Sequence, residues 1–256
     1  MRRKLTALLL DLEGTVYQAG RLIENAADAI AALEARGIRV GYATNTTSRP
    51  RATVARELAA MGLAVPPERL FTAPRAARED LVRRGLTRCS LLLRDSLRDD
   101  FEGVAFDDDA PQAVVLGDLG DEMTFARLNR AFRHVIGGAE LVTLARNRYW
   151  RAADGLTLDV GAFAAALEFA TGRPARLAGK PAPEYWAWAL SELGVDAEHA
   201  AVVGDDIESD VAGAQRAGLA GILVRTGKFR PEELAASGVR PDAILESIAE
   251  LPAALL

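Results

Sequence analysis

Short apolar runs alternate along the chain with longer segments of helical periodicity. Three of the runs have strand length and stop at a turn or a polar segment: residues 5–10, 38–42 and 200–203. Between the first two, residues 25–36 place Ile30 and Leu33 on one helix face and end at Gly37, a typical C-terminal stop. Buried strands that alternate with amphipathic helices predict an α/β fold with a parallel sheet covered on both faces.

The same alternation restarts in the middle of the chain. Strands are predicted at residues 90–93, 113–116 and 141–145, and helices at 124–136 and 159–171. A chain of 256 residues is long for one compact core, so a domain with an insertion is expected. We predict a core made of residues 1–85 and 175–256, with an inserted α/β domain at residues 86–174.

Four polar segments carry groups suited to catalysis. They are Asp11-Leu12-Glu13-Gly14-Thr15, Ala43-Thr44-Asn45-Thr46-Thr47, Gly179-Lys180-Pro181 and Gly204-Asp205-Asp206-Ile207-Glu208-Ser209-Asp210. Three of them follow predicted strands, and open α/β sheets bind ligands at the carboxyl ends of their strands. The first segment alone is also compatible with an ordinary acidic turn. Together, the acids, neutral donors and single cation suit a divalent ion held beside a phosphoryl group.

The order D-x-x-G-T, T-N, K-P and G-D-D-x-x-x-D resembles the haloacid dehalogenase superfamily of phosphatases over nearly the whole chain. Arg148-Tyr149 and residues 158–161, 203–218 and 224–230 are similar to its C2-capped subgroup, class IIA. The resemblance implies a Rossmann-like core with an inserted α/β C2 cap, and a Mg²⁺-dependent phosphatase that works through an aspartyl-phosphate. The implied substrates are small phosphorylated compounds, phosphoamides or pyrophosphate, since a closing cap would exclude most proteins.

The resemblance also assigns roles to the acids. Asp11 is expected to attack the phosphoryl group and to bind Mg²⁺ together with Asp205 and the backbone carbonyl of Glu13. Asp210 is expected to steady the waters of the metal. Asp206 suits either a metal ligand or a residue that faces the surface or lies at the N-terminus of a helix, and both interpretations stay open here.

The phosphate is expected to meet neutral donors and one cation. Thr44 and Asn45 should donate to its oxygens, Thr44 through the hydroxyl and Asn45 through its backbone or side chain. Lys180 should pair with both the nucleophile and the phosphate. Arg148 or Asn147, which follow a predicted strand of the insert, are expected to contact the leaving group.

Glu13 departs from the superfamily pattern, which has a second Asp at this position as general acid/base. Glu is one methylene longer, and close members of the subgroup resemble each other in having Ser there. Glu13 is therefore interpreted either as the catalytic acid/base or as a bystander that points outward.

Two other functions fit the same four segments. A phosphotransferase would pass the phosphoryl group from Asp11 to a second substrate instead of water. A weakly active phosphate-binding regulatory or interaction protein is also conceivable, because of Glu13. A metal-free dehalogenase is disfavoured, since the acids of residues 205–210 would then repel one another without a purpose.

Composition narrows the class of protein further. The net charge of −5 and the pI near 5.3 argue against a nucleic-acid partner, which would favour a basic surface. The single cysteine, Cys89, excludes an intramolecular disulfide and suits a reducing compartment. No apolar run approaches the roughly 18 residues that would span a membrane. We predict a cytoplasmic protein without a membrane partner, and leave a homodimer open.

Overall fold

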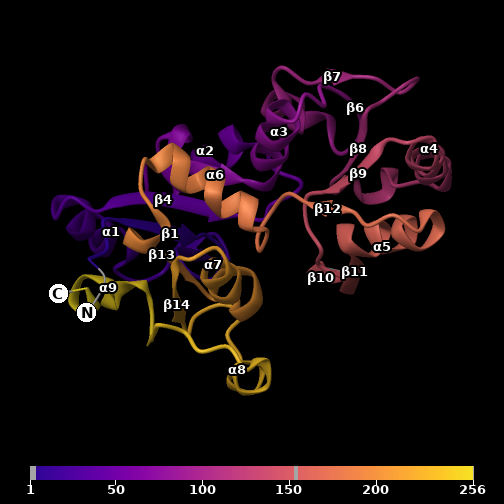
Figure 1. Cartoon of the computed structure of the whole chain (residues 1–256). Helices are drawn as coiled ribbons and strands as arrows, with labels where there is room; N and C mark the ends of the chain where they lie inside the picture. Colours follow the sequence, from indigo (N-terminus) through magenta and orange to yellow (C-terminus); the bar gives the residue numbers. More distant parts are fainter. Residues whose placement is uncertain (1–3, 153–154, 256) are drawn as a thin grey trace. The chain divides into compact units, whose positions relative to one another are not determined.

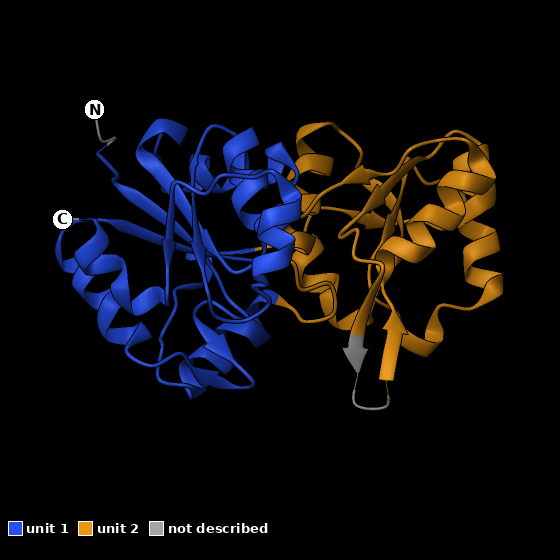
Figure 2. Cartoon of the chain, turned by 90° about the horizontal axis from the view of Figure 1, so that it is seen from below, with its two compact units in different colours: residues 1–44, 51–71, 180–256 blue, residues 45–50, 72–179 orange. Residues whose placement is uncertain are grey.

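The computed structural model describes residues 4–152 and 155–255 (Figure 1). Its contacts divide the chain into two compact units (Figure 2): unit 1 contains residues 1–44, 51–71 and 180–256, and unit 2 contains residues 45–50 and 72–179. The predicted insert, 86–174, lies inside unit 2. The unit begins before residue 86 and continues past residue 174. The reason is that the helix at residues 73–83 shares a buried cluster with Cys89, Leu97 and Val115 of the insert.

Unit 1 is built on a six-stranded sheet with β1 near its centre. The strand order is β15 (Ala243–Leu245), β14 (Ala220–Val224), β13 (Ala200–Gly204), β1 (Ala7–Asp11), β4 (Arg39–Thr44) and β5 (Leu70–Thr72). β1 pairs in parallel with β13 and with β4, so that Leu9 lies between Val202 and Gly41. All five residues of β1 are buried. The predicted buried central strand is confirmed, and the carboxyl ends of β13, β1 and β4 lie at one edge.

Helices cover the sheet of unit 1. They are α1 (Ala26–Ala35), α2 (Arg51–Ala60), α6 (Pro183–Leu193), α7 (Gly213–Arg216), α8 (Pro231–Ser237) and α9 (Leu251–Ala254), with short 3₁₀ turns at Pro67–Arg69, Ala197–His199 and Ile248–Glu250. Ile30 and Leu33 of α1 pack into the same cluster as Leu8 and Leu10 of β1, as their spacing predicts. α1 and α9 lie side by side (Figure 1). A small hairpin, β2 (Tyr17–Gln18) and β3 (Arg21–Leu22), follows the β1 loop.

The segment after β13 begins with a π-helical turn and not with a regular α-helix. Residues Ile207–Ala212 form a π-helical turn, called η5, and α7 begins only at Gly213. The amide of Val211 reaches back five residues to the carbonyl of Asp206, at 3.4 Å. Such turns hold one residue more than an α-helical turn and are frequent at functional sites.

Unit 2 has its own five-stranded sheet. The strand order is β12 (Arg176–Leu177), β9 (Glu140–Thr143), β8 (Ala113–Leu116), β6 (Arg88–Leu92) and β7 (Ala105–Phe106), with all neighbours parallel. The helices are α3 (Ala73–Arg83), α4 (Phe125–Ile136) and α5 (Val160–Thr171), with 3₁₀ turns at Asp95–Phe101 and Gly120–Glu122. Along β8, Val115 packs with α3 on one face, whereas Val114 and Leu116 pack with α4 and α5 on the other.

Unit 2 also contains a hairpin that the sequence analysis missed. β10 (Tyr149–Ala152) and β11 (Gly155–Leu158) pair antiparallel, so that Tyr149 is opposite Leu158. Leu156 and Leu158 are each 63% exposed, and this two-stranded ribbon lacks the buried alternation on which strand prediction depends. The α/β class and the parallel sheets are nevertheless confirmed. No helix among the described residues is long and apolar enough to cross a membrane.

Candidate active site

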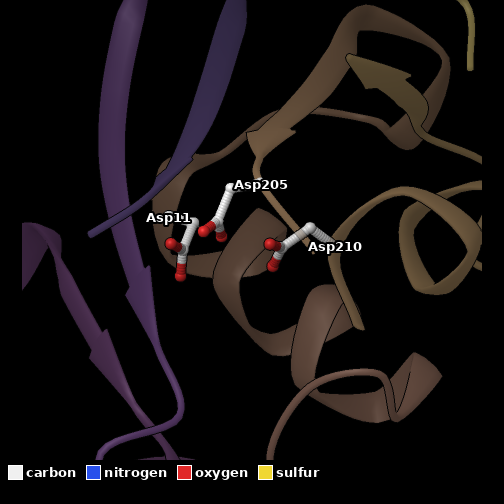
Figure 3. Close-up of side chains that lie close together, drawn as sticks. All are labelled: Asp11, Asp205 and Asp210. Carbon is white, nitrogen blue, oxygen red and sulfur yellow. The ribbon is translucent and has the colours of Figure 1, made fainter. Parts of the chain in front are cut away.

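Three acids meet at the carboxyl edge of the unit 1 sheet. Asp11 ends β1, Asp205 directly follows β13, and Asp210 lies in the π-helical turn η5. Their carboxylates point toward one another (Figure 3), with one oxygen of each within 4.8 Å of the others, and all three residues are buried. Asp11 and Asp205 lie close together because β1 and β13 are parallel neighbours in the sheet.

Lys180 supplies the positive charge of this cluster. Its Nζ lies 2.5 Å from Oδ1 of Asp11 and 2.8 Å from Oδ1 of Asp210, and it also donates to the carbonyl of Ala43 at 3.5 Å. The side chain is buried, and a buried ammonium is stable only when carboxylates or other acceptors surround it. Lys180 therefore joins Asp11, at the end of β1, to Asp210 of η5.

Asp210 is held from two further sides. The backbone amide of Asp206 donates to its Oδ2 at 3.2 Å. Gly204 lies directly beneath it, where any Cβ would overlap the Asp210 carboxylate. Only a glycine at position 204 therefore leaves room for the Asp210 carboxylate to contact Lys180.

Tyr185 fixes the end of β4, where Thr44 lies. The Thr44 amide donates to the Tyr185 hydroxyl at 3.2 Å, and this hydroxyl donates to the carbonyl of Phe71 at 2.7 Å. Tyr185 comes from α6, which begins three residues after Lys180, and it is buried. Tyr185 of α6 thus links the end of β4, which carries Thr44, to β5.

Two of the predicted acids lie elsewhere. Glu13 is exposed, and its Oε1 accepts a hydrogen bond from the amide of Ala19 at 3.3 Å rather than joining the three aspartates. Asp206 caps the π-helical turn, because its Oδ1 accepts from the amides of Glu208 and Ser209 at 3.1 and 3.0 Å. Of the two interpretations of Asp206, the structure therefore favours the helix N-terminus.

Asn45 and Arg148 belong to unit 2. A Cβ on Gly179 would lie 2.7 Å from the Asn45 side-chain oxygen, so this amide packs against that glycine. Arg148 is exposed and places its guanidinium 5.8 Å from the ring centre of Tyr149. Their predicted contacts with the phosphate and with the leaving group stay predictions.

Comparisons with known proteins assign the chain to a family. A family described as haloacid dehalogenase-like hydrolase matches residues 8–107, and a second, described as HAD-hydrolase-like, matches residues 177–251. The human phospholysine phosphohistidine inorganic pyrophosphate phosphatase is 35% identical over 95% of this chain and 91% of its own length. The chain belongs to the haloacid dehalogenase-like hydrolases.

Two further relatives agree with this assignment. The bovine haloacid dehalogenase-like hydrolase domain-containing protein 2 is 38% identical over 90% of this chain and 87% of its own length. The crystal structure of a 4-nitrophenylphosphatase from Thermotoga maritima superposes with a TM-score of 0.91 at 30% identity, covering 99% of this chain and 98% of that one. The predicted class IIA haloacid dehalogenase phosphatase is therefore confirmed at the level of the family.

Burial dominates the electrostatics of this haloacid dehalogenase-like site. It raises the pKa of Asp205 to about 6 and that of Asp210 to about 7, and it also raises the pKa of Asp11. Burial lowers the pKa of Lys180, but the charges of Asp11 and Asp210 outweigh it and leave this pKa well above its ordinary value. Ionisation of these buried acids thus costs free energy, and a further positive charge beside them would offset that cost.

The donor set suits a divalent cation. When ionised, Asp11, Asp205 and Asp210 carry −3, and Lys180 contributes +1, which leaves −2 on the cluster. Carboxylate oxygens are the ligands that Mg²⁺ prefers. The three acids therefore form a cluster that could hold a metal ion.

Sequence reasoning missed the supporting residues of the site. Tyr185 and Gly204 bear no charge and were not singled out individually, although their packing decides where Thr44 and Asp210 lie. Their positions in the sequence were the available signal: Gly204 immediately precedes the two adjacent acids, and Tyr185 lies in the first turn of the helix that follows Lys180-Pro181.

Proposed function

We propose that this hydrolase is a Mg²⁺-dependent phosphatase in which Asp11 is the nucleophile. One observation carries the proposal: the Asp11 carboxylate is paired with Lys180 at 2.5 Å and shares a buried cluster with Asp205 and Asp210. Burial raises the pKa of Asp11 and the Lys180 ammonium opposes this by favouring the ionised carboxylate, which is the form that attacks phosphorus.

Mg²⁺ would be held by Asp11, Asp205 and the backbone carbonyl of Glu13, with Asp210 steadying its waters. When bound, it would offset the negative charge of the acids and of the phosphoryl oxygens. The Glu13–Gly14 peptide is already oriented, since the amide of Gly14 donates to the carbonyl of Tyr17 at 2.7 Å. With these assignments, Mg²⁺ is the metal ion that we propose for the acidic cluster.

The chain's own residues account for the remaining chemistry. An Asp11 oxygen forms a bond to phosphorus while the bond from phosphorus to the leaving group breaks, and the leaving group takes a proton, which we assign to Glu13. Water then attacks phosphorus and gives a proton back to Glu13, the bond from phosphorus to Asp11 breaks with its electron pair returning to the carboxylate, and inorganic phosphate leaves. Thr44, Asn45 and Lys180 would bind the phosphate oxygens in both steps.

Small phosphorylated compounds, phosphoamides or pyrophosphate are the proposed substrates. The name of the human relative, which mentions phospholysine, phosphohistidine and inorganic pyrophosphate, supports this choice. Unit 2 would act as the C2 cap and Arg148 would contact the leaving group. A cytoplasmic location and a homodimer remain predictions.

A phosphatase screen over a metabolite panel tests the proposal. Phosphate release should occur with Mg²⁺, stop with EDTA and return when Mg²⁺ is restored, whereas Ca²⁺ should inhibit because its looser coordination misplaces the nucleophile. Each reaction should also be analysed for phosphorylated acceptors, since transfer without phosphate release would identify a phosphotransferase. Absence of both activities over the panel would favour a phosphate-binding protein.

A further inference from the structure

The turn after β14, Thr226 to Lys228, contacts two of the segments that form the active site. The Thr226 hydroxyl donates to the carbonyl of Gly14 at 2.5 Å. The backbone amide of Lys228 donates to Oδ2 of Asp205 at 2.6 Å. In the sheet order β14-β13-β1, this turn therefore reaches past the end of β13 to the loop after β1.

Two glycines make this contact sterically feasible. Gly14 and Gly227 both have positive φ angles, of 92° and 63°, and a Cβ on either one would overlap the Asp205 carboxylate. A Cβ on Gly227 would also lie only 2.6 Å from the Cα of Gly14. The two backbones thus enclose Asp205 Oδ2, which leaves this carboxylate no room to turn.

We propose that the turn Thr226–Lys228 is a positioning element that fixes the Asp205 carboxylate and the Asp11–Thr15 loop for the metal. The inference rests on the proposed Mg²⁺ site and adds to it residues that touch neither metal nor phosphate. Oδ2 of Asp205 accepts from the Lys228 amide, and one oxygen of the same carboxylate lies within 4.8 Å of one oxygen each of Asp11 and Asp210.

The alternative is that the turn only packs the end of β14 against the sheet. In that case, loss of the Thr226 hydroxyl would lower the stability of the metal-free protein and leave Mg²⁺ affinity unchanged. For a positioning element, we expect the reverse: Thr226 is only half-buried, so stability should change little, whereas residues that orient metal ligands typically contribute about 10–100-fold to metal affinity.

The test compares Thr226→Val, which has nearly the same shape but no hydroxyl, with Thr226→Ser, which keeps it. Arg225→Ala is the neighbouring control, because Arg225 faces Glu246 at 3.3 Å and not the site. Mg²⁺ binding is measured by calorimetry on the full chain, and thermal unfolding is measured in EDTA. Thr226→Val should bind Mg²⁺ about 10–100-fold more weakly, whereas the other two variants should bind like the wild type. The Mg²⁺ concentration that half-activates Thr226→Val should rise by the same factor, with activity recovered at saturating Mg²⁺.

Gly227→Ala tests the same element without using the hydroxyl, and its Mg²⁺ affinity should also fall. If both variants fold and bind Mg²⁺ like an active wild type, the positioning role is wrong and the proposed function stands. If both unfold in EDTA while Thr226→Ser does not, the turn is structural and the inference is again wrong. If the wild type binds no Mg²⁺, the metal site itself is wrong and this inference falls with it.

Discussion

The ammonium of Lys180 lies 2.8 Å from Oδ1 of Asp210, and the two side chains are only 3% and 1% exposed. One is on the segment before α6, and the other is inside the π-helical turn η5. A buried ion pair of this kind is strongly coupled to folding, since removal of one partner leaves an uncompensated charge in the interior.

Lys180→Met should therefore destabilise the protein in a pH-dependent way. Measured by urea unfolding in EDTA, the loss should be about 3–5 kcal/mol at pH 8. Burial raises the pKa of Asp210 to about 7 even beside Lys180, so the folded state holds this proton more tightly than the unfolded state. As the pH falls toward 4, Asp210 and Asp11 become protonated, the ammonium loses its partners, and the difference between variant and wild type should vanish.

Lys4→Met is the control for that experiment, because Lys4 is exposed and lies outside the acidic cluster. Its effect on stability should be small at every pH. A Lys180→Met deficit that stayed constant from pH 4 to pH 8 would contradict the assignment of buried, ionised partners.

Asp11→Asn keeps the shape of the side chain but removes the attacking charge. Turnover should fall by about 10³-fold or more, as in other nucleophile replacements. Mass spectrometry of acid-quenched reactions should detect one phosphoryl group on the wild type and none on the variant. Asp95→Asn, at an exposed position in unit 2, is the matched control and should keep full activity. Substantial activity in Asp11→Asn would exclude the covalent mechanism.

Glu13→Gln tests whether the exposed Glu13 carboxylate delivers a proton. With an alkyl phosphate, the rate should fall by about 10²–10⁴-fold, the usual contribution of a general acid. With p-nitrophenyl phosphate, whose leaving group needs little protonation, the first step should be affected less. Glu13→Asp, which restores the commoner family residue, should retain or raise activity. Equal rates for all three proteins with both substrates would identify Glu13 as a bystander bound to Ala19.

Asp80 of α3 offers a pH test in unit 2. Its carboxylate contacts Arg176 at 2.8 Å and Arg84 at 3.2 Å, with the side chain 13% exposed. Burial raises the pKa of Asp80, but the two guanidinium groups outweigh it and lower this pKa below the ordinary value. Since the folded pKa is below the unfolded one, the stabilisation is complete at neutral pH and is lost as the pH falls through the folded pKa.

Asp80→Asn should thus lower the free energy of unfolding by about 1–3 kcal/mol at pH 7. The difference from the wild type should shrink below about pH 4, near the unfolded pKa of an aspartate. Guanidinium chloride would screen the ion pairs, so urea unfolding is the appropriate measurement. A difference that grew toward acid pH would have the wrong sign for this interpretation.

The sequence predicts best those elements whose side chains are buried with a clear period. The strand at Ala113–Leu116 is predicted with its actual bounds, and Asp11, Lys180, Asp205 and Asp210 are predicted as site residues from their motifs. The hairpin β10–β11 escapes prediction because its apolar residues face outward. The contacts of Thr226 and Tyr185 escape it for another reason: each depends on a partner more than 100 residues away, so no local pattern records them.

Because η5 is a π-helical turn, the geometry of the site depends on the number of residues between Asp206 and α7. On one side of the turn, Asp210 faces Lys180, and on the other, Gly213 packs so closely on Pro181 that a Cβ would lie 2.6 Å from its ring. Deleting one residue would convert the turn to an ordinary α-helix, and it would rotate one contact by about 100° relative to the other. The number of residues in this turn, and not only their identity, therefore determines whether the protein keeps the geometry of this site or only its fold.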